Sequence, residues 1–288
     1  MADLNIVDAQ IHMGPGGIEE VLAAMDALGI AAALIDEYWL EDFANRPHHV
    51  LAGGVQRPVC PTAQLAALRH PARFSWLLRV HRLDPDHDAV IRQVRDAPQG
   101  RALRIDPGMS PAELRQFAEG GYDHILASAC DHGLPLFVFA PDSPEAFERA
   151  ARAFPDLRII VDHCGIFSNS MRTGFAGRDP LDEAAQLALF DRVLALADYP
   201  NVALKWGHAS AMFDRPAWPG EELGAILRRA IARLGADRIM WASDYSVNQR
   251  GETWAELLFS IRGNADLNEA ERSAILGGTL RRWLDWPA

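Results

Sequence analysis

The chain has 288 residues, of which 49% are hydrophobic, and its formal net charge at pH 7 is −11. This length and composition allow one large α/β domain or two small ones, each with a substantial core. The acidic balance argues against binding to nucleic acid or to an anionic membrane surface, although it is compatible with a local basic pocket.

The first predicted strand covers residues 4–12 and ends in the polar residues Gln10 and His12. Glycines and a proline at 14–17 interrupt it, and residues 18–28 then show helical spacing up to Gly29. A second apolar run at 31–35 leads into a polar insert that extends through His49. Further strands are predicted at residues 74–81, 102–106, 136–140, 157–163, 202–206 and 239–244.

Helical patterns lie between these strands, and one of them opens with Ser143 at the N-cap and Pro144 at the first position. Two long loops are expected at residues 164–180 and after residue 206 up to Pro219, and both are long enough to be functional. The other predicted helices cover residues 62–69, 86–94, 111–119, 123–131, 181–196, 221–234, 254–261 and 268–276.

Eight short strands separated by helices predict an α/β fold of the (β/α)8 TIM-barrel type. An open doubly wound sheet is the alternative. However, the glycines at 14–17 do not form a G-x-G-x-x-G phosphate turn, and Pro15 lacks an N–H donor. No linker divides the chain, so we expect a single domain over residues 1–288.

The cysteines favour an intracellular location. Cys60, Cys130 and Cys164 are scattered and lack ligand-like spacing, as expected for free thiols in a reducing cytoplasm. The N-terminus leads directly into a strand pattern, which is not typical of a signal peptide. No apolar run is long enough to span a bilayer, so we expect no membrane partner.

Polar side chains end most of the predicted strands. In residues 239–244 an apolar run leads directly to Asp244, whose carboxylate must be paired, bound to a metal or used as a base. Capping of the next helix is the structural alternative. In a barrel the C-terminal strand ends converge on one site. The predicted members of that site are Gln10, His12, Arg79, His81, Arg104, Asp106, His163, Lys205 and Asp244.

Several segments resemble the amidohydrolase superfamily. D-A-Q-I-H at residues 8–12 is similar to its D-x-H-x-H opening, and V-D-H-C-G at 161–165 resembles the D-H-x-G segment of its amidohydrolase-related branch. Residues 201–205, 237–244 and 267–278 contain resemblances to later segments of that branch, in the right order. The branch includes sugar lactonases, 2-pyrone-4,6-dicarboxylate lactonases and some decarboxylases. The resemblance therefore implies a (β/α)8 barrel that hydrolyses a small cyclic ester.

One residue departs from this family pattern. Gln10 stands where the family has its first metal-binding histidine, and residues 136–140 offer no histidine either. His12, His163 and Asp244 could supply three zinc ligands, but Gln10 is a poor one. We therefore expect no required cofactor. The alternative is a weakly bound divalent metal such as zinc, in a metal-dependent hydrolase or decarboxylase.

Lactone hydrolysis needs a water nucleophile, a base and donors for the developing oxyanion. We predict that Asp244 is the base and that His12 and His163 polarise the carbonyl or protonate the leaving alkoxide. Cys164 is disfavoured as a nucleophile because neighbours on a strand face opposite sides. A non-catalytic binding protein is the remaining alternative, and the presence of both Asp244 and His163 disfavours it.

The expected partner is a small anionic substrate, and a homo-oligomer is left open. Arg79, Arg104 and Lys205 are predicted to hold a substrate carboxylate, unless they pair with Asp106 or Asp244. Arg172 lies in the loop after His163 and is expected to close over the ligand. The predicted substrate-binding residues are Gln10, Arg79, His81, Arg104, Arg172 and Lys205.

Overall fold

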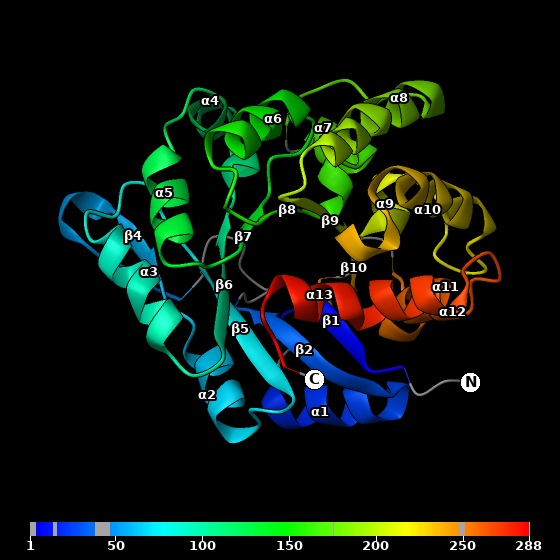
Figure 1. Ribbon diagram of the computed structural model, residues 1–288, viewed down its shortest axis with the longest axis horizontal. Coiled ribbons are helices and arrows are strands. Elements are labelled where there is room, and N and C mark those ends of the chain that lie inside the picture. The colour runs from blue at the N-terminus through cyan, green and yellow to red at the C-terminus, as the bar shows by residue number, and fades with distance from the viewer. Residues whose placement is uncertain (1–3, 14–15, 38–46, 175, 248–250, 288) are drawn as a thin grey trace.

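The computed structural model describes residues 4–13, 16–37, 47–174, 176–247 and 251–287. Eight strands form one sheet in the order β1-β2-β5-β6-β7-β8-β9-β10, and neighbouring strands run parallel. Helices surround the strands on the outside (Figure 1). The protein therefore has the (β/α)8 barrel fold that the sequence predicts.

The strands are short, as expected for a barrel core. They are β1 (Ile6–Ile11), β2 (Ile30–Asp36), β5 (Phe74–Arg79), β6 (Gly100–Ile105), β7 (Leu136–Val138), β8 (Ile159–Val161), β9 (Val202–Gly207) and β10 (Ile239–Ala242). Two further strands, β3 (His48–Val50) and β4 (Gln56–Pro58), form a separate antiparallel hairpin.

The helices mostly follow the strands in alternation. They are α1 (Gly17–Leu28), α2 (Pro61–Arg69), α3 (His87–Asp96), α4 (Pro111–Ala118), α5 (Asp123–Asp131), α6 (Pro144–Ala153), α7 (Asn169–Gly174), α8 (Glu183–Leu194), α9 (Ala209–Met212), α10 (Glu221–Leu234), α11 (Trp254–Arg262), α12 (Glu269–Ser273) and α13 (Thr279–Trp283). Within the described ranges, none of them is long and apolar enough to cross a membrane.

The structure differs from the sequence prediction mainly in the segments that connect strands. The two expected loops contain the short helices α7 and α9, and α13 is not predicted from the sequence. The polar insert contains the β3–β4 hairpin, whereas its residues 38–46 lie outside the described residues, as do residues 14–15. Ser143 does not cap α6, because its hydroxyl donates to the carbonyl of Pro141 at 3.3 Å.

Apolar side chains fill the part of the barrel interior that lies toward the N-terminal ends of the strands. Because side chains alternate along a strand, every second residue points inward. The C-terminal segment packs on these inward residues and closes the end of the barrel where the strands begin (Figure 1). This inner cluster comprises Val7, Ala9, Ala32, Leu34, Leu77, Ala102, Phe137, Ile160, Ala203, Met240, Ala242, Leu280, Trp283, Leu284 and Trp286.

The barrel closes between β1 and β10 through side-chain as well as backbone contacts. A parallel bridge joins Ile11 to Tyr245, and the N–H of Asp244 donates to the carbonyl of Gln10 at 3.0 Å. The buried carboxylate of Asp8 accepts the N–H of Ser243 at 3.0 Å. This seam places the polar end of β1 directly beside Asp244.

Candidate active site

Six buried polar side chains form a ring at the C-terminal end of the apolar interior. Five of them continue the alternation of inward-facing residues along their strands, and Gln10 joins them at a register irregularity of β1 between Asp8 and Ile11. We call these six residues the polar layer. The polar layer consists of Gln10, Asp36, Arg79, Arg104, Asp162 and Lys205.

Asp36 is the centre of one half of the polar layer. Its carboxylate accepts the Nε of Arg79 at 2.7 Å, a nitrogen of Arg104, and the side-chain amide of Gln10 at 3.1 Å. Burial alone would raise the pKa of Asp36, but the guanidinium groups of Arg79 and Arg104 outweigh it and hold this pKa well below its usual range. Asp36 is therefore a charged anchor for both arginines.

Asp162 is the centre of the other half. Its two oxygens lie 2.8 Å from the Nε of Arg104 and 2.7 Å from the Nζ of Lys205. Lys205 also donates to the Oε1 of Gln10, which closes the ring. Burial lowers the pKa of Lys205, and the charge of Asp162 opposes this shift.

The cations of the polar layer are thus paired with carboxylates of the protein. Asp106 adds a contact to Arg79 and lies 3.1 Å from the Nε of Arg104. Since burial of several cations requires compensating anions, these pairs explain how the cations are tolerated. A substrate carboxylate is not needed for charge balance, so substrate binding by Arg79, Arg104 and Lys205 stays a prediction.

Three histidines surround Asp244 beyond the polar layer. Its Oδ1 lies 2.7 Å from the Nε2 of His12, and its Oδ2 lies 2.5 Å from the Nε2 of His208 and 3.8 Å from that of His163. We call these four residues the Asp244 cluster. All of them are buried, so they form one connected site at the strand ends.

The cluster has a distinct charge distribution. Burial would raise the pKa of Asp244, but His208 and His12 hold it well below its usual range. Burial lowers the pKa of His163 well below its usual range, and the nearby ammonium of Lys205 adds to this shift. The site therefore combines an ionised carboxylate with a neutral imidazole.

The backbone turns sharply to bring these side chains together. His163, His208 and Asp244 have φ angles of 46°, 52° and 56°, in the left-handed region that residues other than glycine rarely adopt. Gly207 leaves room for the His163 ring, because a Cβ there would lie 3.3 Å from the Nδ1 of His163. Strained backbone of this kind is concentrated at functional sites.

A divalent metal ion fits one face of the Asp244 cluster. The candidate ligand atoms of His163, His208 and Asp244 lie within 4.8 Å of one another. Two imidazoles and a carboxylate are a donor set typical of zinc. The Nδ1 of His163 is buried and has no hydrogen-bond partner among the described residues. These three residues would be the ligands.

The sequence prediction missed three members of this site. His208 directly follows Gly207, the last residue of β9, and Asp36 continues the inward alternation of Ala32 and Leu34. Asp162 lies inside the segment that resembles D-H-x-G but was assigned no role. The alternation of inward and outward residues along a strand could have identified Asp36 and Asp162. His208, in contrast, depends on a left-handed turn that the sequence does not show.

Two predicted substrate-binding residues, His81 and Arg172, make their contacts outside the polar layer and the Asp244 cluster. His81 is partly buried after β5, where its Nδ1 accepts the N–H of Leu83 at 3.2 Å. Arg172 on α7 donates to the carboxylate of Asp142 and, at 3.1 Å, to the carbonyl of Asp179. Their proposed roles in substrate binding therefore remain predictions.

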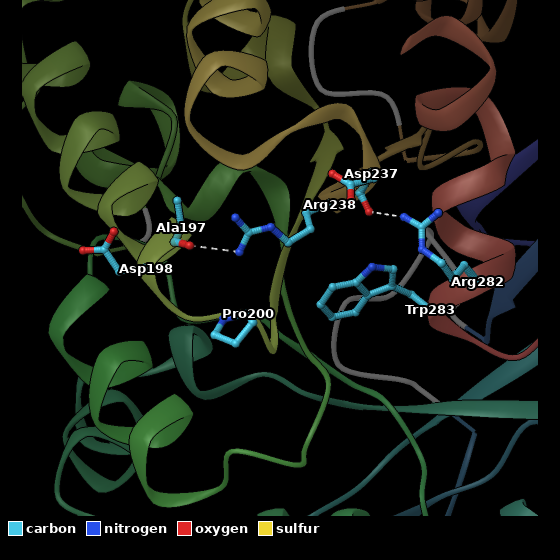
Figure 2. Close-up of a pocket in the computed structure, with 7 residues that line it drawn as sticks. All are labelled: Ala197, Asp198, Pro200, Asp237, Arg238, Arg282 and Trp283. Carbon is cyan, nitrogen blue, oxygen red and sulfur yellow. Dashed lines mark hydrogen bonds between the residues drawn. The ribbon is translucent and has the colours of Figure 1, made fainter. Parts of the chain in front are cut away.

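A hollow of about 440 Å³ lies at the opposite end of the barrel (Figure 2). Arg238 donates to the carbonyl of Ala197 at 3.0 Å, and Arg282 donates to that of Asp237. These residues precede strands or belong to α13, so they are remote from the Asp244 cluster. Residues at this end of a barrel usually serve stability. The lining residues are Ala197, Asp198, Pro200, Asp237, Arg238, Arg282 and Trp283.

Comparisons with known proteins point to one family. Residues 7–286 match the sequence profile of the family described as Amidohydrolase. An amidohydrolase of Burkholderia multivorans, crystallised with zinc, superposes with a TM-score of 0.76 at 16% identity, over 98% of this chain and 99% of its own.

Two other solved structures share the fold. A protein of Pseudomonas putida assigned as a 2-pyrone-4,6-dicarboxylic acid hydrolase has a TM-score of 0.68 at 17% identity, over 99% of each chain. The 5-carboxyvanillate decarboxylase LigW of Sphingomonas paucimobilis has a TM-score of 0.61 at 17% identity, over 98% of this chain and 99% of its own. At these identities the likeness concerns the fold alone.

A curated relative matches part of the chain. The uncharacterized protein y4mH of Sinorhizobium fredii (strain NBRC 101917 / NGR234) is 24% identical over 157 residues. The match covers 54% of this chain and 47% of that protein. The chain thus spans about half the length of the curated relative that it matches.

Proposed function

Because this chain belongs to the amidohydrolase family, we propose that it hydrolyses a small cyclic ester, a lactone, with Asp244 activating the attacking water. The observation that carries this proposal is the position of the Asp244 carboxylate between His12 at 2.7 Å and His208 at 2.5 Å. These contacts keep the carboxylate ionised and lower its basicity, while His163 provides a neutral imidazole in the same cluster.

The proposed reaction assigns one proton path. The oxygen of water bonds to the ester carbonyl carbon while Asp244 takes a water proton and an electron pair moves to the carbonyl oxygen. An N–H of His163 stabilises that oxygen. When the intermediate collapses, the ring C–O bond breaks and the proton passes from Asp244 to the leaving alkoxide. The product is a hydroxy acid.

The substitution Asp244→Asn tests this assignment. It preserves the shape of the side chain and removes its basicity, so turnover should fall by roughly 10²–10⁴-fold. The matched control is Asp191→Asn, which changes an exposed carboxylate of α8 that pairs with Arg229. We expect wild-type turnover from the control, and near-wild-type turnover from Asp244→Asn would refute the role of Asp244.

His208 favours a second candidate, a metal-dependent hydrolase or decarboxylase of the same family. It adds a second imidazole to His163 and Asp244, and this set fits a divalent metal ion. When bound there, the ion would act as a Lewis acid toward the substrate carbonyl or carboxylate. His208→Asn removes one ligand, so the metal content of the purified protein should then drop. Equal metal content in wild type and variant, at or near zero, would argue against this candidate.

The domain organisation, the cellular location and the partners of the protein are also part of the proposal. We propose a single domain in the cytoplasm, acting on a small-molecule substrate without a nucleic-acid or membrane partner. The described cysteines are unpaired, which is compatible with a reducing compartment. A homo-oligomer is left to measurement by light scattering.

A further inference from the structure

A second charged group lies in the loops beside His163. Asp142 follows β7 with a left-handed φ of 60°, and its side chain is only 5% exposed. Its Oδ2 contacts Arg172 and lies 3.1 Å from Arg178, while its Oδ1 accepts the N–H of Phe167 at 3.0 Å. One carboxylate is thus shared by two guanidinium groups.

Among the described residues, this sharing leaves one positive charge without a second carboxylate. Within the described parts of the chain, Asp142 is the carboxylate in ion-pair contact with each of the two arginines. Arg172 is the inner cation, with a side chain 11% exposed and a further bond to the carbonyl of Asp179. The side chain of Arg178 is 37% exposed, so the excess charge is accessible there.

An aromatic wall, whose rings Phe167 and Phe139 are only 2% and 4% exposed, connects Arg178 with the Asp244 cluster. The guanidinium of Arg178 lies 5.6 Å from the ring centroid of Phe167. The Phe167 ring meets that of Phe139 at 6.1 Å, and Phe139 meets the His163 ring at 5.6 Å, both edge to face. The wall therefore leads from an accessible cation to an imidazole that is 3.8 Å from Asp244.

We propose that Arg178 binds a carboxylate of the substrate, whose apolar body lies along Phe167 and Phe139. This inference rests on the proposed function, because it places the ester at the Asp244 cluster. It assigns recognition to Arg178 rather than to Arg172, which anchors Asp142. A guanidinium suits this task because it binds a carboxylate through two parallel hydrogen bonds.

Binding of two small probes tests the subsite without turnover. Benzoate carries the charge and an aromatic ring, and benzamide has nearly the same shape without the charge. We expect the wild-type protein to bind benzoate roughly ten-fold more tightly than benzamide in an NMR titration, as for a charge-assisted hydrogen bond. Equal affinities, or no detectable binding of benzoate, would overturn the proposal.

Variants then assign the preference to one side chain. Arg178→Gln should remove the preference for benzoate, and Arg178→Lys should keep part of it. The matched control is Arg215→Gln, because Arg215 lies in the loop after α9 and is balanced by Glu183 at 2.7 Å and Glu222 at 2.6 Å. A preference that survives in Arg178→Gln, or disappears in Arg215→Gln, would contradict the assignment.

The same variants separate this inference from the proposed function. With an aromatic ester substrate that bears a carboxylate, Arg178→Gln should raise KM roughly ten-fold or more and leave kcat nearly unchanged. For the analogue of that ester in which a carboxamide replaces the carboxylate, the substitution should change KM little. Selective benzoate binding without hydrolysis of any ester would refute the function and keep the subsite. Hydrolysis that is insensitive to Arg178→Gln would refute the subsite and keep the function.

Discussion

At the scale of single residues, Asp162 stabilises the polar layer next to the Asp244 cluster. It is 1% exposed and contacts two buried cations, Arg104 at 2.8 Å and Lys205 at 2.7 Å. Charges at this depth are stable only when they are paired, so removal of the anion leaves an unfavourable excess of positive charge. Asp162 thereby keeps Lys205 next to Gln10 and His163.

The substitution Asp162→Asn should lower the free energy of unfolding by about 3–5 kcal/mol, as expected for a broken buried ion pair. Urea unfolding followed by circular dichroism measures this change. The control is Glu148→Gln, which breaks an exposed i,i+4 pair with Arg152 and should have little effect. An equally small effect for Asp162→Asn would show that the polar layer does not depend on this carboxylate.

Individual site residues could be predicted only in part. Apolar runs that end in Asp244, His163 and His12 were sufficient to place these residues at one end of a barrel. The sequence could not show that Asp36 and Asp162 neutralise the cations, because pairing depends on strand register around a closed ring. His208 was missed because it needs a left-handed turn after Gly207.

At the scale of elements, the seam between β1 and β10 depends on Asp8. Its fully buried carboxylate accepts the N–H groups of Gln10 at 3.1 Å, Ser243 at 3.0 Å and the Trp254 indole at 2.8 Å. Burial raises the pKa of Asp8 from its usual 3.8 to about 6, although these hydrogen bonds oppose the shift. The folded seam thus favours the protonated acid.

Stability should therefore fall as Asp8 ionises. A raised pKa gives a contribution that is fully present below pH 3.8 and is lost as the pH rises through about 6. Asp8→Asn resembles the protonated acid at every pH, so it should gain roughly 2 kcal/mol relative to wild type between pH 4 and pH 7. Urea unfolding at both pH values gives the difference. A difference that does not change with pH would contradict this account.

At the scale of the whole molecule, the C-terminal segment completes the barrel. Strand count and alternation predict the eight parallel strands, but α13 gives too short a pattern to be recognised. Trp283 of α13 packs into the inner cluster, and the indole is 7% exposed. Such a contact between chain ends depends on the tertiary fold and cannot be predicted from local sequence.

Trp283→Ala should lower the free energy of unfolding by about 3–5 kcal/mol, because it leaves a cavity beneath the inner cluster. Turnover per folded molecule should change little, since the Asp244 cluster lies at the other end of the barrel. Trp218→Ala is the control, because this side chain is 53% exposed and should contribute little. Calorimetric unfolding of both variants decides whether α13 closes the core.

Turnover of lactones by metal-free wild-type protein is the most direct test of the central claim. The protein is dialysed against a strong chelator, its metal content is verified by mass spectrometry, and proton release from a panel of lactones is recorded. We predict that at least one lactone is hydrolysed at the same rate before and after metal removal. Failure to hydrolyse any lactone, or activity that returns only with zinc or manganese, would contradict the account.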